Sequence, residues 1–260
     1  MSSTSRRSEV ARTLRRAAVA LALLLAVGGG RVAARDLVVG VENIDYWPAY
    51  AMRDGQYVGT GREILDAFAA DTGDRFVYRP LPVRRLYADL LSGAIDFKFP
   101  DNPGWGPDVK RGHAIVYSGP VIRYVDGVMV LPERKGLGVP ALKTLGTVTG
   151  FTPFALLDLI HDRKVKLVEN PQLPLLLRQA LTRRIDGAYV SIAVATFQLD
   201  VLGSPGGLVF DPALPHSRES YRLSATRHSD VIEAFDRWLV DKHDAVESIK
   251  AHNGAERGLD

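Results

Sequence analysis

The binding chemistry in this sequence centres on one arginine and a short segment of threonines around a glycine. A guanidinium group binds a carboxylate through two parallel hydrogen bonds, so Arg111 is a candidate to hold an acid. Thr149 and Thr152 flank Gly150 just before a predicted helix. Free N–H groups and the helix dipole favour an anion at such a position. These residues predict a site for a small, at least partly anionic, organic solute.

Aromatic side chains can supply the walls of the same site. Tyr46, Trp47 and Tyr50 lie in one loop, and Trp105 lies between glycines in a loop rich in Gly and Pro at 100–107. Aromatic rings stack on apolar or cationic groups of a ligand. The alternative is that the loop residues pack under the first helix and that Trp105 only covers a surface.

Several kinds of chemistry have no support in the sequence. The chain has no cysteine, which excludes disulfides, thiolate metal sites and cysteine nucleophiles. Its six histidines have no metal-ligand spacing, and the phosphate-binding, nucleophile-elbow and zinc-protease motifs are missing. We therefore expect no metal, no cofactor and no catalytic residues.

Short apolar runs alternate with stretches of helical period, a pattern typical of α/β proteins. A first β-α-β-α-β unit is predicted over 37–99, and a second α/β set begins at 145. The predicted strands are 37–41, 76–78, 95–99, 114–117, 127–131, 145–148, 165–168, 187–190, 208–210 and 221–225. The predicted helices are 62–71, 84–91, 153–160, 174–181 and 192–199, with a terminal helix from Ser229.

Two breaks separate the α/β sets, one within 132–140 and one at 203–207. They predict two lobes, each a mostly parallel sheet flanked by helices, joined by two hinge crossings. Residues 35–132 with 208–260 form the first lobe, and 133–207 form the second. Ligands of such sheets bind at the carboxyl ends of the strands, so the site is expected in the cleft between the lobes.

Residues 1–34 have the pattern of a cleavable signal peptide: an arginine-rich start, an apolar run at 17–27 and small residues at 32–34. Whether export follows the general or the twin-arginine route stays open. This segment holds six of the 33 Lys and Arg residues and one of the 30 Asp and Glu residues, so 35–260 carries a net charge of −2. A nucleic-acid function thus loses its main support.

Five motifs, in order, resemble those of family 3 periplasmic solute-binding proteins, the receptors of polar-amino-acid ABC importers. They are Gly55-x-x-x-Gly59-x-x-x-Glu63, Leu90-x-Ser92-Gly93-x-x-Asp96, Arg111 before Ser118-Gly119-Pro120, Gly146 to Thr152, and Arg184-Ile185-Asp186 before Ser191. The resemblance implies the two-lobed type II periplasmic-binding-protein fold. It also implies a ligand bound by the equivalents of Arg111, Thr149, Thr152 and Ser191.

Two departures from the family pattern concern the ligand. Asp108 stands where the family has a threonine, and Ser191 stands where the family has the aspartate that binds an α-amino group. Either Asp101 or Asp108 is a candidate to replace that carboxylate. We therefore expect a ligand other than an ordinary free amino acid.

The leading function is a monomeric periplasmic receptor that delivers a small polar, carboxylate-bearing solute to an ABC permease. Without a cysteine it is not a lipoprotein. One alternative is a soluble accessory or sensory protein that binds another protein. The other is an enzyme like cyclohexadienyl dehydratase, with Asp101 or Asp108 acting beside Arg111.

Overall fold

The first half of the fold is a three-stranded parallel sheet with helices between its strands. The computed structural model describes residues 35–259. Its opening unit comprises β1 (Asp36–Glu42), α2 (Thr60–Thr72), β4 (Arg75–Leu81), α3 (Val83–Ser92) and β5 (Phe97–Asp101). The strands lie in the order β4-β1-β5, all parallel. The predicted β-α-β-α-β unit is confirmed, and β1 occupies its centre.

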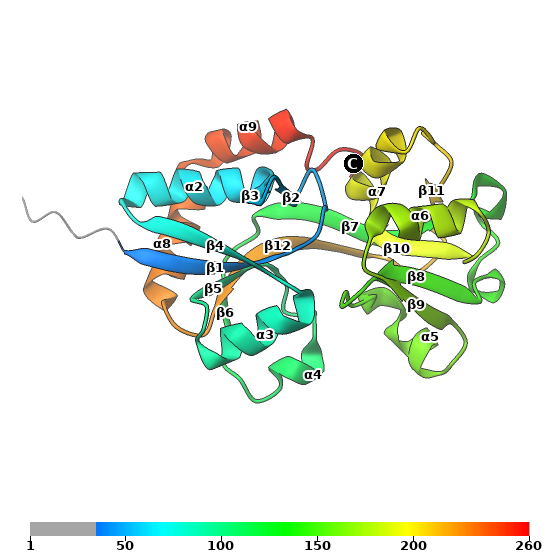
Figure 1. The fold of residues 1–260 in the computed structure, drawn as a ribbon, viewed down its shortest axis with the longest axis horizontal. Helices are drawn as coiled ribbons and strands as arrows, with labels where there is room; N and C mark the ends of the chain where they lie inside the picture. The colour runs from blue at the N-terminus through cyan, green and yellow to red at the C-terminus, as the bar shows by residue number, and fades with distance from the viewer. Residues whose placement is uncertain (1–34, 260) are drawn as a thin grey trace, which may run out of the picture. The chain divides into compact units, whose positions relative to one another are not determined.

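The second half repeats this arrangement. It comprises β8 (Thr144–Val148), α5 (Leu157–His161), β9 (Lys166–Asn170), α6 (Leu173–Leu181) and β10 (Gly187–Ser191). Its strands lie in the order β10-β8-β9, again parallel, so β8 is the central strand as β1 is in the first half. Helices cover both faces of each half of the sheet (Figure 1).

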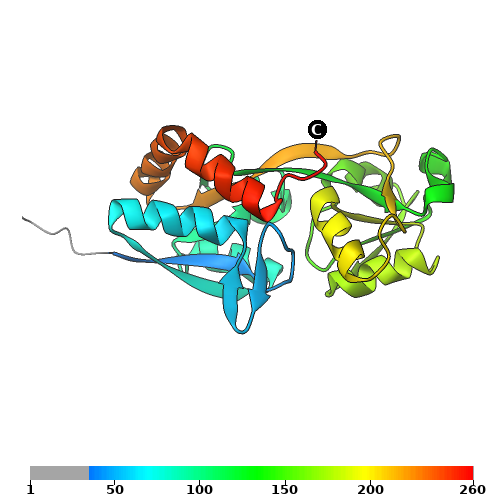
Figure 2. The same cartoon turned by 90° about the horizontal axis from the view of Figure 1, so that it is seen from above.

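Two long strands, β7 (Ile122–Val130) and β12 (Ser217–Ala225), run antiparallel to each other between the halves. β12 pairs with β5 near its end and with β7 near its start, and β7 pairs with β10. One continuous sheet results, and Figure 2 shows the two strands extending from one half to the other. From Asp36 onward the chain forms one compact unit, so the predicted lobe boundaries stay a prediction.

Both connecting strands are longer than predicted. Polar and charged residues at 217–220 do not show the apolar pattern of a buried strand, yet they pair in register with 123–126 of β7. The predicted helix 153–160 is also wrong at its start, because 154–156 form a 3-10 turn and the α-helix begins only at Leu157. Pro153 has a ψ of 69°, which is not helical.

The other elements are short or lie at the edges. They are the hairpin β2 (Ala51–Arg53) and β3 (Gln56–Val58), α4 (Pro107–Lys110), β6 (Val116–Tyr117), the 3-10 turns η1 (Pro132–Arg134), η2 (Val139–Ala141) and η3 (Phe154–Leu156), α7 (Ile192–Val201), β11 (Val209–Phe210), α8 (Ser229–Asp241) and α9 (His243–Asn253). The predicted terminal helix from Ser229 is confirmed as α8, and its residues Phe235 and Trp238 pack against Phe68 of α2.

Across residues 35–259, no helix is both long and apolar enough to cross a membrane. The predicted signal peptide, 1–34, lies outside the described residues.

Candidate functional site

An aromatic pocket lies where the carboxyl ends of the central strands meet. Glu42 is the last residue of β1, and Gly150 follows the end of β8. In both halves the strand order reverses at these central strands, which is where open α/β sheets bind ligands. The gaps between the lining side chains add up to about 420 Å³ when open solvent at the mouth is included, but only about 20 Å³ of this space can be occupied by the centre of a water-sized sphere, so the pocket is nearly closed in this arrangement. Its lining residues are Glu42, Tyr46, Tyr50, Val83, Tyr87, Trp105, Asp126, Gly150, Phe151, Thr152, Tyr189, Val190 and Tyr221.

The loop after β1 carries the first aromatic wall. Tyr46 and Tyr50 form a backbone bridge, with N–O distances of 2.9 and 3.3 Å, and their rings stack with centroids 5.4 Å apart. The ring of Phe151 meets that of Tyr46 edge-on at 5.2 Å. The hydroxyl of Tyr46 accepts a 2.9 Å hydrogen bond from the N–H of Ser191, which ties this loop to the end of β10.

The second wall is built on the connecting strands. Tyr124 of β7 and Tyr221 of β12 stack at 4.5 Å, and Trp105 packs against Tyr221 at 5.8 Å. The N–H of Gly106 donates to Oγ1 of Thr152 over 3.3 Å, which holds the loop of Trp105 against the turn after β8. Residues from both halves of the sheet therefore enclose one space.

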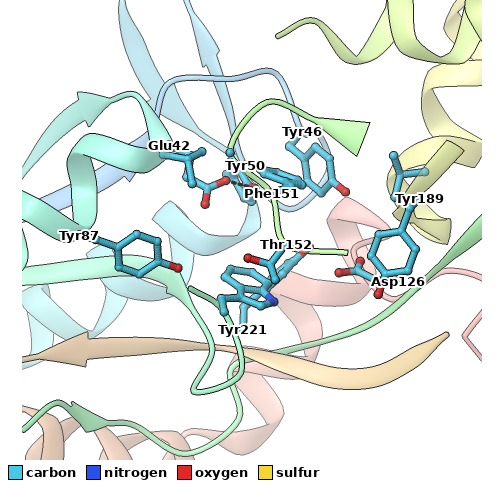
Figure 3. Close-up of a pocket in the computed structure, with 13 residues that line it drawn as sticks. Glu42, Tyr46, Tyr50, Tyr87, Asp126, Phe151, Thr152, Tyr189 and Tyr221 are labelled. Atoms are coloured by element: carbon cyan, nitrogen blue, oxygen red, sulfur yellow. Dashed lines mark hydrogen bonds between the residues drawn. The ribbon is translucent and has the colours of Figure 1, made fainter. Parts of the chain in front are cut away.

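Two carboxylates point into this space from opposite sides, Glu42 and Asp126 (Figure 3). Glu42 is 1% exposed and accepts a 2.5 Å hydrogen bond from the hydroxyl of Tyr50. Burial raises the pKa of Glu42, although the nearby charge of Lys98 works in the opposite direction.

A buried charge network stands behind the Glu42 side of the pocket. It consists of Glu42, Lys98, Asp101 and Lys110. Nζ of Lys98 lies 3.9 Å from Glu42 and 3.6 Å from Asp101, and it also donates to the carbonyl of Pro100. Nζ of Lys110 lies 2.9 Å from Asp101, and Ser224 donates to the same carboxylate at 2.7 Å. Two carboxylates thus face two ammonium groups.

Asp126 has no such compensation among the described residues. Its Oδ1 atom is buried and has no hydrogen-bond partner within 35–259. Burial raises the pKa of Asp126 from its ordinary value of 3.8 to about 7, and the charge of Glu42 adds to the rise. Groups perturbed in this way inside a cleft are candidates for ligand contact.

The turn after β8 offers little to an anion. The N–H of Gly150 donates to the carboxylate of Glu169 over 2.8 Å. The N–H groups of Thr149 and Phe151 donate to the carbonyls of Asn170 and Val148. These backbone donors are therefore engaged within the protein.

The structure brings four of the predicted site residues to the pocket: Tyr46, Tyr50, Trp105 and Thr152. Ser191 lies at the end of β10 and contributes the backbone hydrogen bond to Tyr46. These placements agree with a shared site, while their contact with a ligand stays a prediction.

The other predicted site residues lie away from the lining. Asp101 is fully buried within the charge network, and Thr149 is exposed on the turn. Trp47 lies under the guanidinium of Arg53, which is 4.2 Å from its ring. Arg111 follows the one-turn helix α4, and its side chain is 80% exposed and bonded to Asp108 at 2.6 Å. Arg111 is therefore not among the residues that line the pocket, and its contact with a ligand stays a prediction.

Five further lining residues were not predicted from the sequence: Glu42, Tyr87, Asp126, Tyr189 and Tyr221. Glu42 could have been predicted, because this acid directly follows the predicted strand 37–41, and open α/β sheets bind their ligands at the carboxyl ends of strands. Asp126 interrupts an apolar stretch, and the predicted strand began one residue after it. Nothing in the spacing marks the three tyrosines.

Within the part of the chain that the structure describes, no three His, Cys, Asp or Glu side chains are grouped to hold a metal ion.

The comparisons with known proteins agree with this architecture. The sequence matches no protein-family model and no curated protein. Among solved structures, one similar chain is a histidine kinase sensor domain with similarity to periplasmic binding proteins, at 18% identity over 86% of this chain and 97% of that one, with a TM-score of 0.67.

Two binding proteins are similar to the same extent. The arginine-, lysine-, histidine-binding protein ArtJ of Geobacillus stearothermophilus is 19% identical over 87% of this chain and 98% of its own, with a TM-score of 0.68. The amino-acid ABC transporter substrate-binding protein AbpA of Streptococcus pneumoniae, bound to L-arginine, is 19% identical over 84% and 94%, with a TM-score of 0.66. The chain has the type II periplasmic-binding-protein fold, and the predicted fold class is confirmed.

Proposed function

We propose that this protein is a solute-binding receptor that captures one small organic molecule in the aromatic pocket. The observation that carries the proposal is the composition of the pocket. Glu42 and Tyr87 come from the first half of the sheet, whereas Thr152 and Tyr189 come from the second. A ligand in contact with both halves stabilises the arrangement in which they are close together.

The mechanism is closure of two lobes about the connecting strands. The lobes are 35–132 with 208–260 and 133–207, and β7 and β12 are the crossings between them. Three contacts hold the pocket shut: Arg84 with Glu169 at 3.1 Å, Gly106 with Thr152, and Ser191 with Tyr46. Each joins one half of the sheet to the other, so rotation about the crossings breaks all three and opens the pocket.

The receptor acts in the periplasm, where it presents the closed form to an ABC permease and carries out no chemical step. The signal-like segment 1–34 supports export, and the fold is shared with AbpA and ArtJ. A sensory role has one observation in its favour, the likeness to the histidine kinase sensor domain.

Calorimetry and thermal-shift measurements on residues 35–260, unfolded and refolded to release co-purified molecules, test the proposal. The library should include amines, polyamines, amino acids, carboxylic acids and sugars. We expect one chemical class to bind with one-to-one stoichiometry and to raise the melting temperature. A pocket variant, Tyr221→Leu, should lose this binding, whereas Val240→Ala at an exposed position should retain it.

Two other results would overturn the proposal. Binding by no compound of the library, together with stoichiometric co-purification of a protein, would favour the accessory role. Consumption of prephenate or arogenate by the refolded protein would favour an enzyme.

A further inference from the structure

We infer that the solute is an organic cation with a single positive charge and no carboxylate, and that Asp126 binds its cationic group. The inference rests on the proposed function and names the chemical class that the pocket selects.

The buried charges in and behind the pocket indicate a ligand with a single positive charge. In the charge network, Lys98 and Lys110 offset Glu42 and Asp101. Among residues 35–259, no Lys, Arg or His lines the pocket, so no side chain there offsets Asp126. One negative charge is left over, and one positive charge in the ligand balances it.

The surroundings of Asp126 show that a donor is missing. Its buried Oδ1 finds no partner in the described part of the chain. The hydroxyl of Tyr189 is paired with Oγ of Ser217 at 3.2 Å, the hydroxyl of Tyr46 accepts from the N–H of Ser191, and neither hydroxyl lies within hydrogen-bond distance of Oδ1 of Asp126. A buried acceptor without a donor is destabilising, so a ligand N–H or a cationic methyl group at this point gains the interaction that the protein leaves unmade.

The aromatic walls suit the rest of such a ligand. Tyr46, Tyr189 and Tyr221 all lie close enough to Asp126 to be perturbed by its charge. Ring faces attract cations, and they also cover the apolar body of an amine. Two of the lining rings, Tyr87 and Trp105, already contact an ammonium group, that of Lys98, which is buried behind the pocket at 4.8 and 5.5 Å from them.

The pocket has no comparable binding position for a carboxylate of the ligand. The donors of the turn at 149–151 are engaged, and the ammonium of Lys98 is shared by Glu42, Asp101 and the Pro100 carbonyl. Glu42 and Asp126 would repel an added anion from both sides of the pocket. An α-amino acid therefore binds more weakly than the amine that lacks its carboxylate.

Matched pairs of compounds test the inference. Phenethylamine and L-phenylalanine differ by one carboxylate, as do 3-methylbutylamine and L-leucine, while 1,5-diaminopentane adds a second cation. Calorimetry at pH 8 should give at least tenfold tighter binding for each monoamine than for its amino acid and for the diamine. Tighter binding of the amino acids or of the diamine would overturn the inference and leave the proposed receptor function standing.

Variants assign the contact to Asp126. Asp126→Asn should weaken monoamine binding by at least tenfold, and Asp200→Asn, at an exposed acid on α7, is the control that changes the charge equally and should retain full affinity. The exchange variant Asp126→Ser with Ser191→Asp restores one carboxylate to the pair and should recover part of the lost affinity. Equal affinity in Asp126→Asn and the control would overturn the assignment.

Discussion

Asp126 of β7 and Ser191 of β10 are register partners across an antiparallel strand pair. Residues directly opposite each other in such a pair have their side chains on the same face of the sheet. The resemblance to family 3 receptors assigns an amine-binding aspartate to position 191, where this chain has serine. A carboxylate is nevertheless present at this point of the fold, because the neighbouring strand supplies it.

Binding of a monoamine should weaken as the pH falls through about 7. The cation pairs with ionised Asp126, and the pKa of this carboxyl in the ligand-free protein is about 7, raised by burial. Below that pH a proton competes with the ligand, so the affinity for phenethylamine should fall toward tenfold per pH unit. Calorimetry between pH 5 and 9 measures the slope.

The variant Asp126→Asn isolates this effect from other acids. Glu42 also faces the pocket, and its pKa is raised by burial. Any pH dependence of the affinity that remains in the variant is therefore assigned to Glu42. The groups that face Asp126 from the surrounding elements are otherwise tyrosines whose pKa values are raised, namely Tyr46, Tyr124, Tyr189 and Tyr221. An affinity of the unmodified protein that does not change between pH 5 and 8 would contradict the prediction.

Asp126→Asn should also stabilise the ligand-free protein, but only at high pH. Between pH 3.8 and about 7 the folded protein keeps a proton on Asp126 that the unfolded chain has lost. The free energy of unfolding therefore falls as the pH rises through this window, and the asparagine variant escapes the loss. We expect the variant to be more stable by about 4 kcal/mol at pH 8 and by less than about 1 kcal/mol at pH 4.

Urea unfolding at pH 4, 6 and 8 without ligand measures this difference, and Asp200→Asn serves again as the control for charge. A stability gain that is the same at all three pH values would show that Asp126 is not the responsible group.

Much of the fold could be read from the sequence because its signals are local. Apolar runs, glycines at helix ends and helical periodicity placed all the strands of the two parallel units. The polar start of β12 escaped detection because its partner, β7, lies about 90 residues earlier in the chain. Pairing between segments so far apart in the chain produces no periodic pattern in the sequence.

The site was harder to predict because its charges are organised by tertiary contacts. Lys98 and Lys110 look like ordinary surface lysines in the sequence, yet Lys98 is fully buried and Lys110 is 8% exposed. Arg111 has the side chain that a carboxylate site requires, but it follows a single helical turn and extends into solvent. The residue type alone could not distinguish these environments.

Arg111→Ala distinguishes the two interpretations of the site. The sequence predicts a large loss of ligand affinity, since Arg111 would hold a carboxylate. The structure predicts affinities for L-phenylalanine, which has a carboxylate, and for phenethylamine that both stay within twofold of those of the unmodified protein, and a change in stability of at most about 0.5 kcal/mol, because an exposed ion pair contributes little. A tenfold loss of affinity in calorimetry would restore Arg111 to the site.

Lys98→Met tests the role of the charge network, first in the stability of the protein and then in the choice of ligand. The methionine retains a side chain of similar length but removes one of the two ammonium groups, which leaves Glu42 and Asp101 with only Lys110 between them. Breaking a buried ion pair on one side is destabilising by about 3–5 kcal/mol at neutral pH. The loss should be smaller at pH 5, because a raised pKa lets Glu42 take up a proton.

The same variant should change the preferred ligand charge. With Lys98 removed, the pocket and the network carry two uncompensated negative charges in place of one, so a dication balances them better than a monocation. The ratio of affinities for 1,5-diaminopentane and 3-methylbutylamine should therefore rise at least tenfold relative to the unmodified protein, as measured by calorimetry at pH 8. A loss of folded protein lowers the apparent affinity for both compounds by the same factor. The ratio therefore reports the ligand preference of the pocket even in a destabilised variant. An unchanged ratio would mean that the charge of Lys98 is not felt in the pocket, although its Nζ lies 3.9 Å from Glu42.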